Sequence, residues 1–408
     1  MKKTVISFLS ALILLISCST DFELNAPYKT IPIVYGLLDQ SQDTQFVKIN
    51  RSFLGYGNNV NYAAINDCTE FNNVIAVLEE YNEFGSMIDQ DTLRELMVGN
   101  LDQGIFYEDS QKVYFFESLY DTLREENSYH LKVSVPERNL EFDARTEMIK
   151  GSWLNFKYQT YLFLRINGFK VADVDLATTD DNGYFDQSLR WVTAEGGRRY
   201  ELVFRLHYTE VYNDLSEQDK YLEWNLGRQI SVSTEGGEEM FKDIAGVSFF
   251  NWVVSQLENN ENESDVLKRV LKMDAVELIL TAGNDDLNTY MQVNEPVTGV
   301  VTERPIFTNV NNGYGIFASK YSTKLSTFLS DGTMLELCAG QLTSGFKFCC
   351  DSANLVPQNS ATQAVAISLL TGGVEVGCNK SLQLHELEKY TLVLGINPDI
   401  LPFSRSEN

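Results

Sequence analysis

Alternating apolar and polar positions dominate the first 150 residues and predict short β-strands. The clearest case is 129–135, where every odd position is apolar and every even one is polar. Such alternation buries one face of a strand and leaves the other in water. About seven short strands of this kind, separated by turn residues, favour an immunoglobulin-like or fibronectin-like sandwich over residues 28–150. The other strand signals lie at 31–38, 46–50, 74–81, 113–116 and 140–146.

A second pattern, over residues 151–350, predicts another β-rich domain with a smaller helical part. Strands are indicated at 156–166, 200–206 and 276–280, with a hairpin turn at 193–197. Apolar residues at helical spacing predict helices around 237–258, 264–272 and 285–293, and Ser264 and Asn284 are suitable caps for the last two. We therefore expect a mainly β chain of two domains, followed by a C-terminal extension at 351–408.

The first 17 residues have the pattern of an export signal. Lys2 and Lys3 are followed by an apolar run over 5–16, which is shorter than the roughly 20 residues that span a bilayer. The following Leu-Ile-Ser-Cys stretch, ending at Cys18, resembles the lipobox of bacterial lipoproteins. That resemblance implies that the Cys18 sulfur carries lipid, with 18–27 as a tether to the fold. An ordinary signal peptide that ends near a cysteine is the alternative.

The residues after Cys18 bear on which membrane holds the anchor. Ser19 stands where inner-membrane retention signals have aspartate, so the resemblance favours the outer membrane. Asp21 and Glu23 are similar to the acidic surface-export signal of Bacteroidota lipoproteins, although here the acidic run is incomplete. We expect an outer-membrane, lipid-anchored protein, with display on the cell surface favoured over a periplasmic face.

The composition argues against one class of partner. The formal net charge is −25, and removal of the signal with its two lysines takes it to −27. Such a charge repels phosphate backbones and anionic headgroups, so nucleic-acid binding is disfavoured. Solubility alone is a sufficient explanation of the charge.

Five cysteines remain after the lipidated one: Cys68, Cys338, Cys349, Cys350 and Cys378. Because an exported protein meets an oxidising compartment, a disulfide from Cys338 to either Cys349 or Cys350 is the leading expectation. A metal site is the rival, but a C-x-x-C spacing is missing from the sequence. The three histidines, at 130, 207 and 385, lie far apart, so we expect no metal and no cofactor.

Catalytic signatures are missing from the sequence as well. It contains no G-x-S-x-G, and His385-Glu386 lacks the second histidine of a zinc protease motif. The acidic stretch 180–186 does not fit a calcium loop, because Thr178 and Leu189 stand where ligands would be needed. Asn182-Gly183 is more simply a hairpin turn.

One stretch resembles a known family. The segment 305–318 contains Asn-Asn-Gly-Tyr-Gly-Ile-Phe, and its candidate turn residues are Asn312, Gly313, Gly315 and Phe317. It is similar to a motif of Bacteroidota outer-membrane lipoproteins of unknown function, as are the early Ile-Val-Tyr-Gly-Leu-Leu at 33–38 and the strand before Pro136. The resemblance covers about residues 18–350. It implies an N-terminal β-sandwich and genes often placed beside TonB-dependent transporters, with no enzymatic activity.

These observations lead to three functional hypotheses. The first is a non-enzymatic accessory or ligand-binding lipoprotein of an outer-membrane β-barrel complex, of the TonB-dependent transporter type. The second is a surface adhesin or a structural component of a secretion or gliding apparatus. The third is a glycan-active enzyme. The sequence does not identify the ligand.

Overall fold

The computed structural model describes most of the chain between residues 29 and 349. The described ranges are 29–54, 60–63, 65–99, 110–118, 123–151, 162–166, 169–178, 183–258, 263–295 and 305–349. The predicted signal 1–17, the tether 18–27 and the extension 351–408 lie outside the described residues, and so does Asn182 of the predicted turn.

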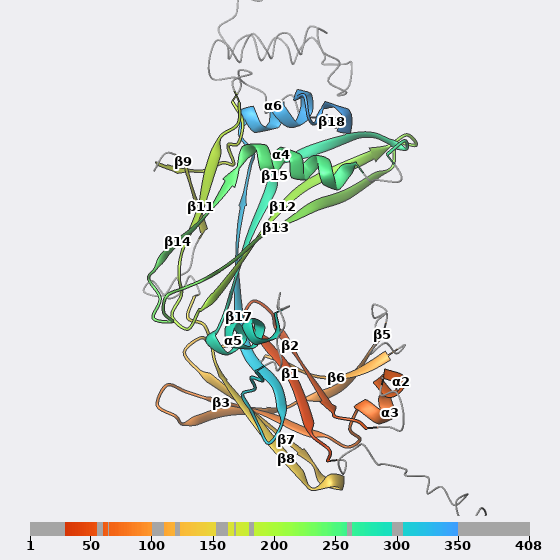
Figure 1. Ribbon diagram of the computed structural model, residues 1–408, viewed down its shortest axis with the longest axis vertical. Coiled ribbons are helices and arrows are strands. Elements are labelled where there is room, and N and C mark those ends of the chain that lie inside the picture. The colour runs from red at the N-terminus through yellow and green to blue at the C-terminus, as the bar shows by residue number, and fades with distance from the viewer. Residues whose placement is uncertain are drawn as a thin grey trace, which may run out of the picture.

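Two β-sandwich lobes follow one another along the long axis of the molecule (Figure 1). The mainly β fold predicted from the sequence is therefore confirmed. The first lobe contains β1 (Pro32–Asp39), β2 (Thr44–Arg51), α2 (Val60–Ala63), α3 (Asn66–Thr69), β3 (Ile75–Tyr81), β4 (Met87–Thr92), β5 (Arg94–Gly99), β6 (Ser110–Glu117), β7 (Ser128–Val135), the 3-10 turn Pro136–Arg138, β8 (Leu140–Glu147) and β16 (Val310–Asn311).

The first lobe has the strand order of an immunoglobulin-like sandwich. One sheet runs β5-β6-β2-β1 and the other runs β4-β3-β7-β8, which is the ABED and GFC arrangement of that fold with one added edge strand. Alternation in β7 buries Tyr129, Leu131, Val133 and Val135, as the sequence predicts. These side chains meet residues such as Val34 of β1 to form the core between the sheets.

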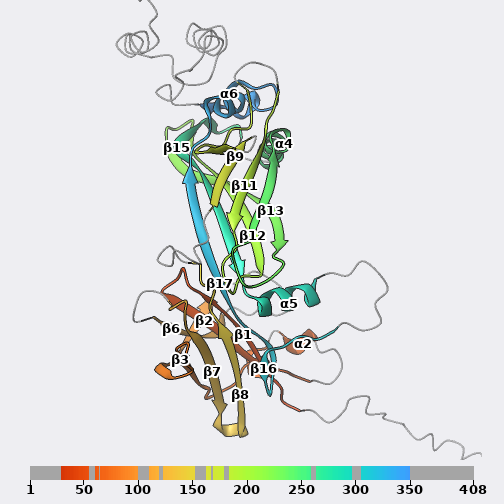
Figure 2. The ribbon, with the colours of Figure 1, turned by 90° about the vertical axis from the view of Figure 1, so that its left-hand side faces the viewer.

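The second lobe is also built from two sheets. Its sheets run β13-β12-β15-β17 and β10-β9-β11-β14. The helices α4 and α6 lie at the end farthest from the first lobe, whereas α5 lies where the lobes meet (Figures 1 and 2). Side chains of both sheets and of the helices α4 and α6 share one core. The elements are β9 (Leu162–Ile166), β10 (Phe169–Val171), β11 (Asp186–Val192), β12 (Arg199–Tyr212), β13 (Glu217–Ile230), β14 (Glu239–Ala245), α4 (Gly246–Leu257), β15 (Val266–Gly283), α5 (Asp285–Asn294), α6 (Asp331–Ala339), the 3-10 turn Ser344–Phe346 and β18 (Phe348–Cys349).

One strand, β17 (Tyr314–Thr327), belongs to both lobes. Its first half pairs in parallel with β1, up to the partners Asp39 and Lys320, and its second half pairs antiparallel with β15. Just before it, β16 pairs with β8. The chain thus leaves the first lobe after β8, builds the second lobe, and returns to complete the first. The sequence predicts that this returning stretch belongs to the second domain at 151–350, whereas β16 and the first half of β17 pair with strands of the first lobe.

The predicted helix at 264–272 is wrong, because these residues begin the long strand β15. Val266, Arg269 and Leu271 are buried there, and burial alternates only from Arg269 onward, because the pairing with β12 shifts register between Val266 and Lys268. Since an inward position is occupied by the charged Arg269, the apolar residues alone do not show a period of two. The remaining apolar positions happened to match helical spacing.

The predicted helix at 237–258 is correct only from Gly246 onward, because 239–245 form β14. A Cβ atom at Gly246 would lie 2.3 Å from the carbonyl oxygen of Leu176, so a residue without a side chain begins the helix where it touches a neighbouring segment. The predicted helix at 285–293 is confirmed as α5. Its cap is also confirmed, since the Asn284 side chain accepts a hydrogen bond from the Leu287 amide at 3.0 Å.

None of the helices in the described ranges has the length and apolar character needed to cross a bilayer. In the same part of the chain, no three metal-ligating side chains gather closely enough to hold an ion.

Candidate functional site

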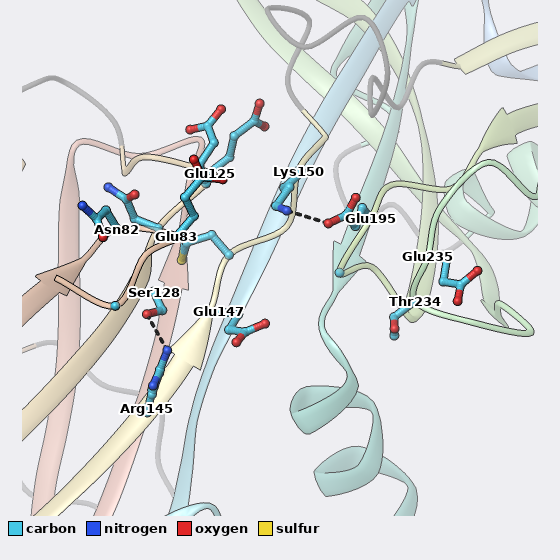
Figure 3. Close-up of a pocket in the computed structure, with 15 residues that line it drawn as sticks. Asn82, Glu83, Glu125, Ser128, Arg145, Glu147, Lys150, Glu195, Thr234 and Glu235 are labelled. Atoms are coloured by element: carbon cyan, nitrogen blue, oxygen red, sulfur yellow. Dashed lines mark hydrogen bonds and ion pairs between the residues drawn. The ribbon is translucent and has the colours of Figure 1, made fainter.

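A polar cleft of about 720 Å³ lies where the two lobes meet (Figure 3). Segments far apart in the sequence line it, and glutamates are the commonest residue among them. The first lobe contributes Asn82, Glu83, Gly85, Glu125, Glu126, Asn127, Ser128, Arg145 and Glu147; the connection and the second lobe contribute Met148, Lys150, Glu195, Gly196, Thr234 and Glu235.

The β3–β4 turn forms one rim of the cleft. The Asn82 side-chain oxygen accepts hydrogen bonds from the amides of Phe84 and Ser86, both at 3.0 Å. This is how asparagine commonly stabilises a turn. Gly85, with φ of +76°, completes the turn and leaves Glu83 at the cleft.

Behind this rim, a buried hydrogen-bond network fixes the start of β7. The Glu80 carboxylate accepts hydrogen bonds from the Asn127 amide and, at 3.0 Å, from the Tyr129 hydroxyl. Burial raises the pKa of Tyr129 well above its usual range, and the neighbouring Glu80 charge adds to the effect. The hydroxyl therefore stays protonated and keeps donating. This network holds Asn127 and Ser128 in the cleft wall.

An ion pair joins the two lobes across the cleft. Lys150 Nζ lies 2.5 Å from Glu195 Oε1, and the Lys150 amide donates to the Glu195 carbonyl oxygen at 2.9 Å (Figure 3). The loop that carries Glu195 is tightly packed. The Gly196 amide donates to the Thr234 carbonyl oxygen at 2.7 Å, and a Cβ atom at Gly236 would lie 2.7 Å from the Glu195 nitrogen.

The chemistry of the cleft is that of an acidic, hydrogen-bonding surface. Six glutamates face two cations among its lining residues, so its potential repels anions and attracts positively charged groups. Ser128 does not have the environment of a nucleophile here. Its hydroxyl accepts a hydrogen bond from Arg145 at 3.0 Å, and a guanidinium has no acceptor with which to activate it.

We expect Glu195→Gln to lower the free energy of unfolding by no more than about 1 kcal/mol, because both partners of the ion pair remain partly in water. We also expect the radius of gyration from X-ray scattering to be unchanged, because β17 continues through both lobes. Glu235→Gln, on the same wall, is the matched control. An increase in the radius of gyration in Glu195→Gln alone would mean that the ion pair, not the strand, sets the lobe arrangement.

The family-like turn residues lie away from this cleft and have a structural role. Asn312 has φ of +58° and Gly315 has φ of +107°. A Cβ atom at Gly315 would lie 1.9 Å from the carbonyl oxygen of Val34, which explains the glycine. Gly313 sits close to Pro32, where a Cβ atom would be 3.1 Å from the carbonyl oxygen. This turn therefore lets β17 lie tightly against β1.

Phe317 completes the motif from inside the sandwich. Its side chain is fully buried and occupies the space beside Gly36, where a Cβ atom would be 2.6 Å from the Phe317 ring. Asn309 holds its backbone at both ends, accepting from the Phe317 amide at 2.9 Å and donating to its carbonyl oxygen at 2.7 Å. The motif joins the returning chain to both sheets of the first lobe.

The described residues test only part of the cysteine predictions. Cys338 of α6 is disulfide-bonded, while Cys68 is a free thiol. The side chain of Cys349, all of Cys350 and the lipid site Cys18 lie outside the described residues. The pairing of Cys338 with Cys349 or Cys350 therefore stays a prediction, and so does lipidation of Cys18.

The sequence does not predict the cleft. Its lining residues come from separate turns, and glutamate is too common in this chain to mark a site by itself. One signal was present. The sequence predicts the turn at 193–197. It does not predict that the Asn82 turn lines the same cleft, or that Gly236 and Gly237 lie beside this turn.

Comparisons with known proteins give little further guidance. No protein-family model matches this chain, and neither does any curated protein. Among solved structures, the C-terminal globular domain of an oligosaccharyltransferase from Pyrococcus abyssi is similar at 9% identity, over 74% of this chain and 52% of that chain, with a TM-score of 0.22. This chain thus spans about half the length of that domain. A TM-score this low carries no argument about fold or activity.

Proposed function

We propose that this chain is an outer-membrane lipoprotein that acts without catalysis, as an accessory or ligand-binding component of an outer-membrane β-barrel complex. The lipobox-like sequence at Cys18 and the absence of catalytic motifs from the sequence support this proposal. The two-sandwich body supports it as well, because such folds commonly present surfaces for binding.

The direction of the shared strand is the observation that carries the proposal. β1 runs from Pro32 toward Asp39, and β17 runs parallel to it and onward into the second lobe. The Pro32 end of β1 is therefore the end of the molecule opposite the second lobe (Figure 1). A lipid on Cys18 would hold that end near the membrane and point the second lobe away from it. The body then acts as a rigid spacer that presents the cleft and the outer lobe to partners.

Isolation of the tagged, full-length chain from its native membranes in mild detergent tests this function. We expect an integral outer-membrane β-barrel protein to co-purify with the wild type. Cys18→Ala should lose that partner together with its membrane attachment, while a Cys68→Ala control keeps both. Recovery of the anchored wild-type protein without any barrel partner would contradict the proposal.

The alternatives give different outcomes. An adhesin or a structural component of a secretion or gliding apparatus would alter adhesion or motility on deletion and leave nutrient uptake intact. A glycan-active enzyme would release products when the purified protein is incubated with polysaccharides. Either result in the absence of a barrel partner would replace the accessory role.

A further inference from the structure

The outer surface of the sheet β5-β6-β2-β1 carries large apolar side chains. Strand alternation turns Tyr35 and Phe46 outward, and they are 47% and 48% exposed. Strand and helix residues together form what we call the apolar face. It consists of Tyr35, Leu37, Phe46, Leu96, Phe115, Tyr290 and Met291.

The apolar face extends over four strands and one helix. Phe46 and Phe115 are partners on β2 and β6, with ring centroids 6.3 Å apart, and the Arg94 guanidinium of β5 lies 4.5 Å from the Phe115 ring centroid. On the other side, a groove of about 490 Å³ separates β1 and β2 from α5. Tyr35, Phe46, Tyr290 and Met291 line it, and the side chains of Tyr35 and Tyr290 are hydrogen-bonded to each other. α5 lies beside β1 where the lobes meet (Figure 2).

The opposite outer face of the same sandwich carries charged pairs, although Ile75 on it is 52% exposed. There, Lys132 Nζ lies 2.8 Å from Glu79 Oε1, and His130 Nε2 lies 2.8 Å from Asp143 Oδ2. One sandwich therefore has a charged face that suits water and an apolar face that does not. Contiguous exposed apolar surface of this kind typically marks an interaction site.

The charges around the apolar face favour a protein over a lipid surface. Each cation nearby is matched by a carboxylate. The pairs are Lys48 with Glu70, Arg94 with Glu117, Lys112 with Glu95, and Lys320 with Asp39. Attraction to anionic headgroups needs clusters of unmatched basic residues. In the described part of this face these four cations are paired instead, and the chain as a whole is strongly negative.

The tether limits where this partner can be. Residues 18–28 span at most about 40 Å when fully extended, so a lipid on Cys18 keeps the first lobe close to its membrane. A partner that contacts the first lobe must therefore lie within about 40 Å of the membrane surface. The extramembrane segments of an integral protein of the same membrane are always within this distance.

We propose that the apolar face is the docking surface for an extramembrane segment of an integral outer-membrane protein, which presents aliphatic and aromatic side chains to β1, β2 and α5. This inference rests on the proposed function and locates its partner on the fold. The groove beside α5 receives a side chain of the partner, and the Phe46–Phe115 pair forms the flat part of the contact. Aromatic residues in such positions commonly dominate the energy of an interface.

Photo-crosslinking in cells that make the lipidated chain tests this placement. A benzophenone amino acid replaces Phe46 on the apolar face or, as the control, Lys132 on the polar face. We expect position 46 to give a conjugate that mass spectrometry identifies as an integral outer-membrane protein, at a yield at least ten times that from position 132. Equal yields, a conjugate with a second copy of this chain, or a conjugate with lipid alone would each overturn the proposal.

A double substitution separates this inference from the proposed function. Leu37→Lys with Phe46→Lys should reduce co-purification of the barrel partner at least ten-fold, whereas Lys132→Gln should leave it unchanged. Because both apolar side chains are exposed, the thermal unfolding midpoint should stay within a few degrees of wild type, which checks the fold. A partner retained by the double variant would refute the docking face and leave the accessory role standing. A wild-type protein that is anchored but without a partner would refute both.

Discussion

Gly315→Ala should lower the free energy of unfolding by about 3 to 5 kcal/mol, which is one of the two largest effects expected from a single substitution in this chain. Gly315 has φ of +107°, which L-residues rarely adopt. Its Cβ atom would also lie 1.9 Å from the carbonyl oxygen of Val34, a backbone atom that cannot rotate away. The first half of β17 would have to separate from β1. Chemical denaturation followed by circular dichroism measures the effect.

Gly85→Ala is the matched control for Gly315→Ala. Gly85 also has positive φ, but nothing lies within 4 Å of the position its Cβ atom would take. It should therefore show only the conformational penalty, about 1 to 2 kcal/mol. Equal losses in the two variants would show that the close approach of β17 to β1 adds nothing to stability.

Arg269→Met should destabilise the second lobe by a similar amount, about 3 to 5 kcal/mol, because it leaves a buried carboxylate with only one of its two cationic partners, Lys220. The Arg269 side chain is fully buried, and its Nη2 lies 2.9 Å from Glu210 Oε1. It also pairs with Glu263 and donates to the Phe346 carbonyl oxygen at 2.7 Å. Arg269 of β15 thus links β12 and the segment after α6 through hydrogen bonds and ion pairs. Differential scanning calorimetry should show a lower unfolding temperature.

The pH dependence of stability provides a second measurement on this cluster. Burial alone would raise the pKa of Glu210, but hydrogen bonds from Lys220 and Tyr212 and the charge of Arg269 outweigh it and lower the pKa below the usual 4.5. The stabilisation is therefore complete above pH 4.5 and is lost as the pH falls through the lowered value. Glu210→Gln should lack this part of the acid dependence. If its stability fell with acid as steeply as that of wild type, the stabilisation assigned to Glu210 would be refuted.

The parts of the fold that the sequence predicted are those with strong local patterns. The strand at 129–135 was recognisable because its alternation is unbroken, and α5 because Asn284 caps an apolar turn. The helix at 264–272 was mispredicted because Arg269 fills an inward position through ion pairs, and such a pairing is not visible in a hydrophobic pattern. The start of α4 was misplaced for a related reason, since β14 pairs with β11, a contact between distant segments.

Local sequence patterns predict neither the return of the chain to the first lobe nor the position of the cleft. The glycines at 313 and 315 suggested a turn and a close approach, but the approach is to Val34, about 280 residues earlier in the chain. The cleft depends on the same long-range pairing. Lys150 and Glu195 meet because β17 fixes one lobe on the other, and neither residue is distinctive in the sequence.

We propose, above all, that lipid at Cys18 holds this two-lobe body on a membrane. Intact-mass analysis of the full-length chain extracted from its native membranes tests that most directly, alongside growth with a clickable palmitate analogue. We predict a chain that begins at Cys18, carries acyl groups and takes up the label, with labelling abolished in Cys18→Ala. An unmodified chain recovered from the cytosol or the culture supernatant, or equal labelling of Cys18→Ala, would contradict the account.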